Sequence, residues 1–187
     1  LFMLERELFL DWRERATRDH LDLLDFLTGD VLTRLGDRLL DMGAKVILIK
    51  CGSRGVYGRT APAKTMGELP LFRDAHRARE WASREIWRAT FSVDRVVSAT
   101  GAGDSAIAGF LASALRGLTF EDSVEMACAV GACNVTAMDA LSGVLSWDET
   151  RRRIATGWKP NPTEIHGTGW TPLMPQTLWA GPRHEKT

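Results

Sequence analysis

The sequence predicts an α/β protein in which part of a doubly wound, mostly parallel sheet is flanked by helices. The first observation is the apolar run Val46-Ile47-Leu48-Ile49, because a strand without a polar face suits a parallel sheet covered on both sides. The second is the alternation of helical and strand-like segments along the chain. The third is a glycine-rich turn at residues 101–103, which places a helix of small residues directly after the last predicted strand.

The first 87 residues contain two helices, a strand hairpin and an insertion. The hydrophobic period of residues 28–42 predicts the clearest helix, with Leu32 and Leu35 on one face and Gly43 as its end. In chain order we expect a helix at 1–10, a helix at 28–42, a strand at 46–49, a returning strand at 56–60, and a loop insertion at 61–87 with one short helix at 75–83. The sequence assigns no role to this insertion.

The second half of the chain continues the alternation. Residues 91–97 predict a strand that leads into the glycine-rich turn, and the helix that follows ends at Gly117. Thr119 is typical of an N-cap, with Asp122 as its capping partner, for a helix over residues 120–138. After residue 150 the chain becomes rich in Trp, Pro and Thr. We therefore predict one domain over 1–150 and, over 151–187, a helix end followed by a tail that is an extended strap or disordered.

Composition and charge exclude several classes of function. The chain carries 24 Lys and Arg residues against 24 Asp and Glu residues, so it lacks the basic stripe of a nucleic-acid binder. The short run Arg151-Arg152-Arg153 is interpreted as a solvated helix face. No apolar run reaches the ~20 residues that cross a bilayer, so no membrane partner is expected.

The cysteines and histidines predict a cytoplasmic protein without a transition-metal site. Cys51, Cys128 and Cys133 form no C-x-x-C pair and lie among apolar or small residues, as reduced core thiols do. The four histidines are scattered and lack the spacing of metal ligands. We therefore assign no protein ligand to any metal.

The turn Thr100-Gly101-Ala102-Gly103-Asp104 carries the candidate chemistry. The backbone amides of Gly101, Ala102 and Gly103, together with the positive end of the following helix, predict an anion hole for a phosphoryl group. A carboxylate at this place would repel a merely bound phosphate, but it suits a reaction in which a hydroxyl is deprotonated as it attacks phosphorus. The residues therefore indicate phosphoryl transfer with Asp104 as the general base.

This turn resembles the signature of the ribokinase-type carbohydrate kinases, also called the phosphofructokinase-B family. Residues 46–57, which include Gly52-Ser53-Arg54-Gly55, resemble the family's nucleotide-side strand and Gly-Ser-Arg-Gly turn in the right order. The resemblance covers residues 1–150 and implies a ribokinase-like fold and ATP-dependent phosphorylation of a hydroxyl on a sugar or sugar-like small molecule. It also implies Mg²⁺, with most of its ligands supplied by the ATP phosphates.

The resemblance also implies what this chain does not contain. Family members are expected to carry sugar-binding residues, a lid and an Asn/Glu metal-site motif in an N-terminal half, and no such segment is present in this sequence. The chain therefore resembles a C-terminal fragment that we expect to be inactive alone. An open strand edge and a bare apolar face would favour its association, and a homodimer is compatible with the sequence.

The resemblance assigns roles on the nucleotide side. Gly52 and Gly55 would let the backbone pass close to the nucleotide, Ser53 would bond a phosphate oxygen, and Lys50 would act as a nearby point charge. Asn134, the one polar side chain in the small-residue run of its helix, would contact the nucleotide. Two structural alternatives stay open: the glycines make only a tight hairpin, or Asn134 is a hydrogen-bonded core amide.

The sequence departs from the family pattern just before the turn. Ser98 and Ala99 stand where many members have an acidic residue and a Thr. Because that acidic position helps to bind a monovalent cation in some relatives, we do not expect potassium activation. The carbonyls near Asn134, Ala137 and Asp139 are the remaining candidates for such a site.

Two other classes of function stay open as alternatives. The pattern Gly101-x-Gly103-x-x-Ala106 satisfies the loose dinucleotide fingerprint of an NAD-dependent oxidoreductase, with Glu121 near the ribose-binding offset. However, Glu121 falls in the first turn of a predicted helix, and the charge of Asp104 would oppose a pyrophosphate. The other alternative is a non-catalytic nucleotide-binding module, because the sugar half is not in this chain. Ketoses, aldoses, sugar acids, nucleosides and cyclitols all remain candidate substrates.

Overall fold

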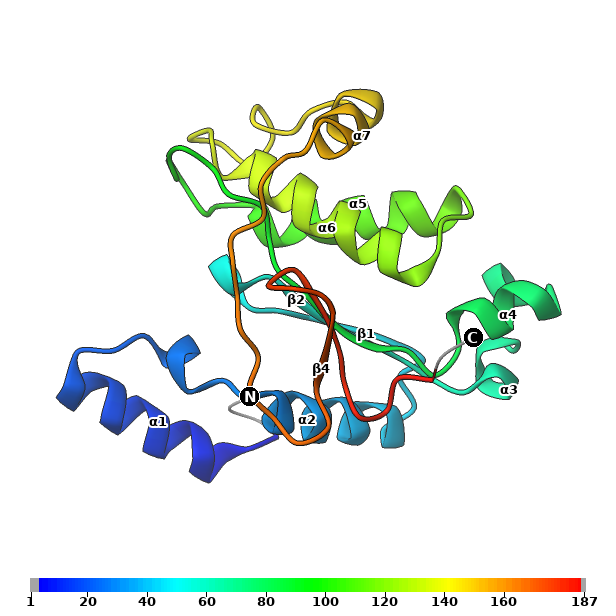
Figure 1. Ribbon diagram of the computed structural model, residues 1–187, viewed down its shortest axis with the longest axis horizontal. Helices are drawn as coiled ribbons and strands as arrows, with labels where there is room; N and C mark the ends of the chain where they lie inside the picture. Colours follow the sequence, from blue (N-terminus) through cyan, green and yellow to red (C-terminus); the bar gives the residue numbers. More distant parts are fainter. Residues whose placement is uncertain (1–3, 186–187) are drawn as a thin grey trace.

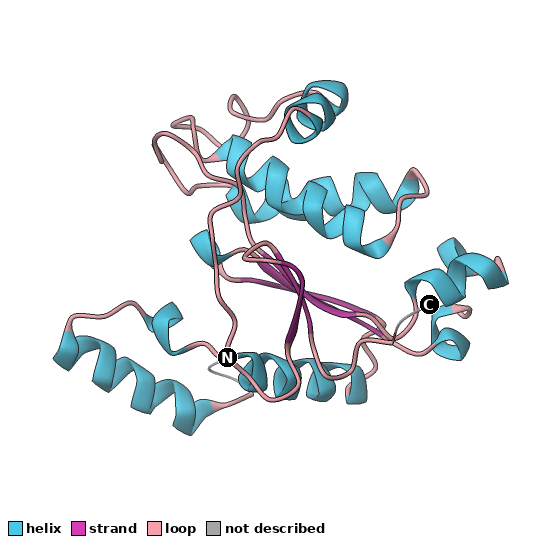
Figure 2. Cartoon of the chain, in the orientation of Figure 1, coloured by secondary structure: helices cyan, strands magenta, loops and turns pink. Residues whose placement is uncertain are grey.

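A computed structural model describes residues 4–185 of the 187-residue chain. Figure 1 shows a central sheet with the long helices α5 (Ala102–Leu115) and α6 (Phe120–Asn134) over one face and α2 (Gly29–Asp41) against the other. Figure 2 shows the same layers by secondary structure. Helices thus flank the sheet on both faces, which confirms the predicted α/β class.

The remaining elements complete this arrangement. In chain order they are α1 (Arg6–Asp19), the 3-10 helix η1 (Leu23–Phe26), β1 (Val46–Lys50), the 3-10 helix η2 (Gly52–Arg54), β2 (Val56–Thr60), α3 (Ala63–Met66), the 3-10 helix η3 (Pro70–Phe72), α4 (Ala75–Trp81), β3 (Glu85–Arg88), α7 (Trp147–Ala155), β4 (Thr171–Met174) and β5 (Leu178–Ala180).

The sheet has the strand order β1-β2-β3-β5-β4, and within residues 4–185 every pairing is antiparallel. Typical partners are Val46 with Thr60 and Trp87 with Trp179. The prediction of a mostly parallel sheet is therefore wrong. The tight turn through η2 sends β2 back along β1, and such a short connection can join only antiparallel strands.

The helices with clear capping residues lie where the sequence predicted them. The Thr28 hydroxyl accepts from the Val31 amide at the start of α2, and the Thr119 hydroxyl accepts from the Asp122 amide at 3.1 Å at the start of α6. Gly43 follows α2 in the left-handed region, with φ of +99°. The predicted helix at 75–83 corresponds to α4. The helix predicted at 1–10 overlaps α1 only from residue 6, because α1 begins at Arg6 and continues to Asp19; residues 1–3 lie outside the described part.

Two predictions near the end of the sheet are wrong. Residues 91–97 do not form a strand: Phe91 makes a single bridge to Pro160, and the amides of Val97 and Ser98 donate to the Val135 carbonyl instead. The strand lies earlier, as β3, inside the predicted loop insertion. All four residues of β3 are buried, including Glu85 and Arg88, whose charges hid it from the hydrophobic pattern.

Two apolar clusters hold the layers together, one on each face of the sheet. Under α5 and α6, the Trp81 ring meets the edges of Phe110 and Phe120 at centroid distances of 5.8 Å and 5.4 Å. On the other face, Tyr57 and Trp87 pack with residues of α1, α2 and the tail. The α5–α6 hairpin and the β1–β2 turn are thereby fixed relative to each other, and the candidate site lies between them.

The tail is an ordered strap. After α7 it crosses the sheet edge, and β5 pairs with β3 through Ile86–Ala180, Trp87–Trp179 and Arg88–Leu178. The extended form is therefore the correct one of the two that the sequence left open.

Candidate functional site

The glycine-rich turn lies at the N-terminus of α5. Gly101 is the N-cap residue and adopts φ of +77°. The Ala102 amide donates to the Ala99 carbonyl at 3.3 Å, whereas the amides of Gly101, Gly103 and Asp104 have no backbone acceptor in residues 4–185. The positive end of the helix dipole adds to these amides, so the backbone at this end of α5 carries a partial positive charge. Of the three predicted anion-hole amides, only two are free.

Lys50 reaches the same helix end from the end of β1. A methyl group added at Gly103 would lie 2.5 Å from Lys50 Nζ, so the ammonium group sits directly over the Gly103 backbone. Lys50 is exposed and forms no ion pair with any residue the structure describes. An unpaired cation beside free amides increases the local positive potential. The structure therefore brings Lys50 and the turn together, although they are far apart in the sequence.

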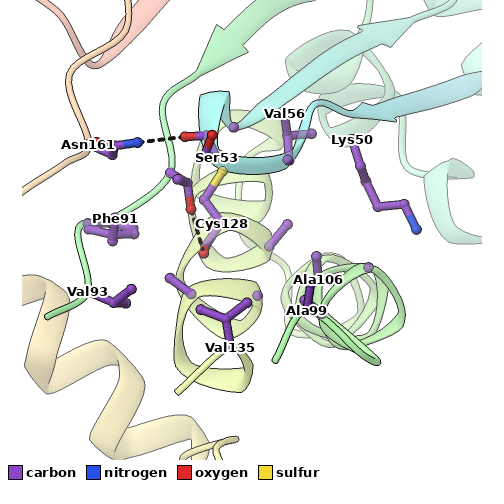
Figure 3. Close-up of a pocket in the computed structure, with 18 of the residues that line it drawn as sticks. Lys50, Ser53, Val56, Phe91, Val93, Ala99, Ala106, Cys128, Val135 and Asn161 are labelled. Atoms are coloured by element: carbon purple, nitrogen blue, oxygen red, sulfur yellow. Dashed lines mark hydrogen bonds between the residues drawn. The ribbon is translucent and has the colours of Figure 1, made fainter. Parts of the chain in front are cut away.

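A cavity of about 480 Å³ extends from this helix end (Figure 3). One wall is the small-residue face of α6, formed by Ala127, Cys128, Gly131, Ala132 and Val135. Because small side chains leave the helix backbone uncovered, this wall is flat and apolar. A cavity of this size, mostly apolar and polar at one end, suits a nucleotide-sized ligand.

The Gly-Ser-Arg-Gly turn forms another side of the cavity. Gly52, Ser53 and Gly55 line it, and Gly55 has φ of +106°. A Cβ at Gly55 would lie 2.0 Å from the Arg88 carbonyl oxygen, so this glycine is also required by the sheet. Arg54 is not among the lining residues: its guanidinium donates to the carbonyls of Leu24, Leu27 and Glu164. The turn thus serves both the hairpin and the cavity.

Asp104 lies in the first turn of α5, next to the cavity rather than in its lining. Its side chain is exposed and has no hydrogen-bond or ion-pair partner among residues 4–185. A carboxylate that is free, exposed and next to the free amides can approach a hydroxyl group from solvent.

Asn134 is not brought to the cavity. It is 0% exposed, and its Nδ2 donates to the Ala140 carbonyl at 2.6 Å. Its Oδ1 has no partner in the described part of the chain. This geometry supports the structural alternative, in which Asn134 holds the 138–142 loop behind Gly101. Asp139 caps that loop by accepting from the amides of Leu141 and Ser142, which lowers the pKa of its carboxyl to about 2.

Sequence reasoning missed the lining residues Thr90, Phe91, Ser92, Val93 and Asn161. Thr90–Val93 were expected to lie in or next to a sheet strand, and Asn161 lies in the Trp- and Pro-rich tail, where no motif marks it. The Asn161 amide donates to the Thr90 carbonyl at 2.7 Å, and the Ser92 amide donates to the Lys159 carbonyl at 2.9 Å. The tail and the 90–93 segment thus close the cavity together.

The three cysteines are free and buried, as the sequence predicted. Cys128 lines the cavity, and burial raises the pKa of its thiol to about 12. Such a thiol stays protonated at neutral pH, so it contributes packing rather than nucleophilic chemistry.

The dinucleotide alternative is not supported by this arrangement. α5 and α6 are joined by the short turn 116–119, so Glu121 lies beside the C-terminal end of α5, away from Gly101. Glu121 instead faces Arg84 at 3.5 Å. The strand that should precede the fingerprint is also missing, because residues 91–97 are irregular.

Residues 4–185 contain neither a membrane-spanning helix nor a metal-binding cluster. No helix there combines the length and the apolar character that crossing a membrane requires. No group of three or more His, Cys, Asp or Glu side chains there is arranged to hold a metal ion.

Comparison with known proteins gives concordant matches. Residues 19–147 match the family model described as pfkB family carbohydrate kinase. A 2-dehydro-3-deoxygluconokinase of Bacillus subtilis is 30% identical to this chain over 133 residues, which cover 71% of this chain and 33% of that protein.

Solved structures show the same fold. A putative ribokinase II from E. coli in its apo form matches with a TM-score of 0.52 and 21% identity, over 66% of this chain and 33% of its own. A ribokinase from Arabidopsis thaliana complexed with ribose and ATP matches with a TM-score of 0.51 and 21% identity, over 70% of this chain and 37% of its own. The fold is therefore ribokinase-like, and the chain spans about a third of the length of these relatives.

Proposed function

Because this chain belongs to the pfkB family of carbohydrate kinases, we propose that the whole protein uses ATP to phosphorylate a hydroxyl group of a sugar or sugar-like molecule. The observation that carries the proposal is the convergence of four groups at the N-terminus of α5. These are the Lys50 ammonium, the free amides of Gly101 and Gly103, and the unpaired carboxylate of Asp104. An apolar cavity of about 480 Å³ opens from the same point.

In the proposed complex the nucleotide occupies this cavity. Its base lies against the small-residue face of α6, and its phosphates reach the end formed by Gly103 and Lys50. Ser53 and the two glycines of the 52–55 turn lie along the path between base and phosphates. The apolar wall binds the base by dispersion and desolvation, while the positive end binds charge.

Each of these residues then has its own role in phosphoryl transfer. Asp104 accepts the proton of the substrate hydroxyl while the hydroxyl oxygen forms a bond to the γ-phosphorus and the bond to the leaving ADP oxygen breaks. The amides of Gly101 and Gly103 and the Lys50 ammonium stabilise the negative charge on the transferring group. Because Asp104 faces solvent beside the cavity, the acceptor substrate approaches from the open side.

Mg²⁺ would enter with the nucleotide, whose phosphate oxygens are its preferred ligands. Residues 4–185 supply no cluster of carboxylates or histidines for it, so we assign the ion no ligand from this chain. When bound, it would neutralise phosphate charge. A monovalent cation site is not proposed. Of the candidate carbonyls, that of Asn134 already accepts a hydrogen bond from the Ala137 amide at 3.2 Å.

The name of the Bacillus subtilis relative makes a sugar acid the first acceptor to test. The decisive experiment measures ATP consumption by the intact kinase with a panel of sugars, sugar acids, nucleosides and cyclitols. Asp104→Asn keeps the side-chain shape and removes the base, so turnover should fall by at least about 100-fold. Asp122→Asn is the matched control, since Asp122 is an exposed Asp in the first turn of α6.

Either result is informative. An Asp104→Asn enzyme that keeps its turnover would remove Asp104 from the role of base. An intact protein that binds ATP but phosphorylates none of the panel would favour a non-catalytic nucleotide-binding protein. Loss of turnover in Asp122→Asn as well would show that removing an acidic charge from the first turn of a helix lowers turnover by itself, so the loss in Asp104→Asn would not identify a base.

A further inference from the structure

The strap that follows α7 lies outside the residues that match the kinase family model, yet it closes the cavity. Trp158 Nε1 donates to the Ser92 carbonyl at 2.7 Å, and the Asn161 amide donates to the Thr90 carbonyl at 2.7 Å. These bonds fix residues 158–161 against the 90–92 segment. The strap is therefore part of the wall rather than a loose extension across it.

Asn161 is the one amide side chain among the described residues that line the cavity. Its Nδ2 donates to the Ser53 carbonyl at 2.8 Å, which ties the strap to the Gly-Ser-Arg-Gly turn (Figure 3). Its Oδ1 forms no hydrogen bond with any residue from 4 to 185. Because the amide is held by its nitrogen, the oxygen has a defined position and remains a free acceptor.

Among the other polar side chains of the lining, those of Ser92 and Thr90 are engaged, whereas the Ser53 hydroxyl has no hydrogen-bond partner among residues 4–185. The Ser92 hydroxyl donates to the Pro160 carbonyl at 3.0 Å, and the Thr90 hydroxyl donates to the Cys128 carbonyl at 3.4 Å. Lys50 belongs to the helix end, and Figure 3 shows Lys50 and Asn161 on opposite sides of the cavity. If phosphates occupy the Lys50 end, the base occupies the end formed by Phe91, Val93 and Asn161.

We propose that Asn161 recognises the nucleotide base and favours adenine over guanine. Its Oδ1 accepts a hydrogen bond from the exocyclic amino group of adenine, whereas guanine presents a carbonyl oxygen at the same ring position and would be repelled. The Nδ2 bond to Ser53 holds the side chain in the orientation that this requires. This inference rests on the proposed nucleotide site and assigns its base selectivity to the strap.

The test measures binding of ADP and of GDP to the full 187-residue chain by calorimetry. The wild-type chain should bind ADP at least about tenfold more tightly than GDP, because Asn161 Oδ1 forms a hydrogen bond with adenine but repels the carbonyl oxygen of guanine. Asn161→Leu and Asn161→Ser should weaken ADP binding about two- to tenfold and remove most of the preference. Asn161→Asp should lose part of the preference, because it retains an acceptor but loses the Nδ2 bond to Ser53 that orients the side chain.

The control is Glu164→Gln, which changes an exposed strap side chain outside the cavity lining and should leave both affinities unchanged. Thermal melting establishes whether each variant is folded. If Asn161→Leu does not fold, Asn161→Ser alone is compared with the wild type. An unchanged ADP preference in these two variants would overturn the role of Asn161 while leaving the nucleotide site intact. Absence of any ADP binding by the folded wild-type chain would overturn both the site and this inference.

Discussion

Gly101 shows how a single residue can be required for two independent reasons. Its φ of +77° lies in the left-handed region, which other residues adopt only with strain. A Cβ at this position would also lie 2.5 Å from the Cβ of Ala140, in the loop behind the turn. Gly117 has a similar φ of +85° but nothing within 4 Å of a built Cβ. Comparing the two glycines therefore distinguishes the cost of a left-handed backbone from the cost of a steric clash.

Replacing each glycine by alanine should give different losses of stability. Gly117→Ala should lower the free energy of unfolding by about 1 kcal/mol, the cost of a left-handed alanine. Gly101→Ala should cost clearly more, about 2–3 kcal/mol, because the methyl group also displaces the 138–142 loop. Urea denaturation of both variants measures the difference. Equal losses would mean that the loop moves aside freely.

The Asp139 carboxyl should make the stability of the same loop depend on pH. Its pKa is lowered to about 2 because it accepts hydrogen bonds from the amides of Ser142 and Leu141 and from the Ser142 hydroxyl. A lowered native pKa contributes stability that is fully present above the unfolded value of about 4 and is lost as pH falls toward 2. Asp139→Asn should therefore flatten the stability profile between pH 4 and 2, as measured by urea denaturation at each pH. A variant profile parallel to that of the wild type would contradict this.

Some residue contacts were accessible from the sequence and others were not. The turn at 100–104 was predicted as an anion site from its own residues, and the turn at 52–55 was predicted as a nucleotide-side motif from its resemblance to the family. The approach of Lys50 to Gly103 depends on how β1 and α5 pack, and no local pattern encodes it. The role of Asn134 could not be decided from the sequence, because a polar residue in an apolar helix is equally compatible with a ligand contact and with a hydrogen-bonded core amide.

At the scale of the elements, the buried carboxylate of Glu85 links strands β2 and β3 to helix α2 and to the tail. Glu85 of β3 is 0% exposed and accepts from the Tyr57 hydroxyl at 2.9 Å and from the Arg183 amide at 2.7 Å. It also pairs with Arg59 of β2 at 3.2 Å, and Arg59 in turn pairs with Asp37 of α2 at 3.0 Å. Burial beside this carboxylate raises the pKa of the Tyr57 hydroxyl. The network explains why charged residues occupy the middle of the sheet.

Glu85→Gln should destabilise the protein strongly, because it leaves the buried Arg59 with only its partner in α2. We expect a loss of about 3 kcal/mol, at the low end for breaking a buried ion pair because Asp37 remains. Asp11→Asn breaks the exposed pair with Arg15 and should change stability by less than about 0.5 kcal/mol. Chemical denaturation compares the two variants. A small loss in Glu85→Gln would mean that neutral hydrogen bonds suffice to hold the strap.

The helices were more predictable than the strands for physical reasons. The cap at Thr119 is a local signal, and the structure places it where the sequence predicted it; the helix predicted from residue 28 begins after Thr28, which caps it. β3 was missed because the charges of Glu85 and Arg88 are neutralised by partners that lie far along the chain. The β1–β2 hairpin was predicted, but the antiparallel pairing of β3, β4 and β5 was missed, because an apolar strand does not reveal the direction of its neighbours.

At the scale of the whole molecule, the sheet ends in two edge strands, β1 and β4, and the β1 edge lies beside exposed apolar surface. Within residues 4–185, β1 pairs only with β2, so its other edge has free backbone groups. Beside this edge lies an apolar cavity of about 290 Å³ between α1, η1 and α2, lined by residues that include Trp12, Leu32 and Ile49. Open strand edges and exposed apolar surface both favour association.

The isolated 187-residue chain should therefore associate as its concentration rises. Sedimentation velocity over a range of concentrations should show species larger than the monomer, and added urea below the unfolding transition should reduce them. A monodisperse monomer at every concentration, with cooperative unfolding, would show that the β1 edge is sufficiently protected.

The contact between Phe91 and Trp158 has an optical consequence. Their rings stack at a centroid distance of 4.6 Å, and Phe91 lines the cavity. Arg153 lies 3.8 Å from the Trp158 ring centroid, so the indole is held between a cation and an aromatic face. Any molecule that enters and shifts Phe91 changes the surroundings of this indole directly. Trp158 is thus a natural fluorophore at the rim, and in a variant whose other six tryptophans are replaced its emission would report occupancy without an attached label.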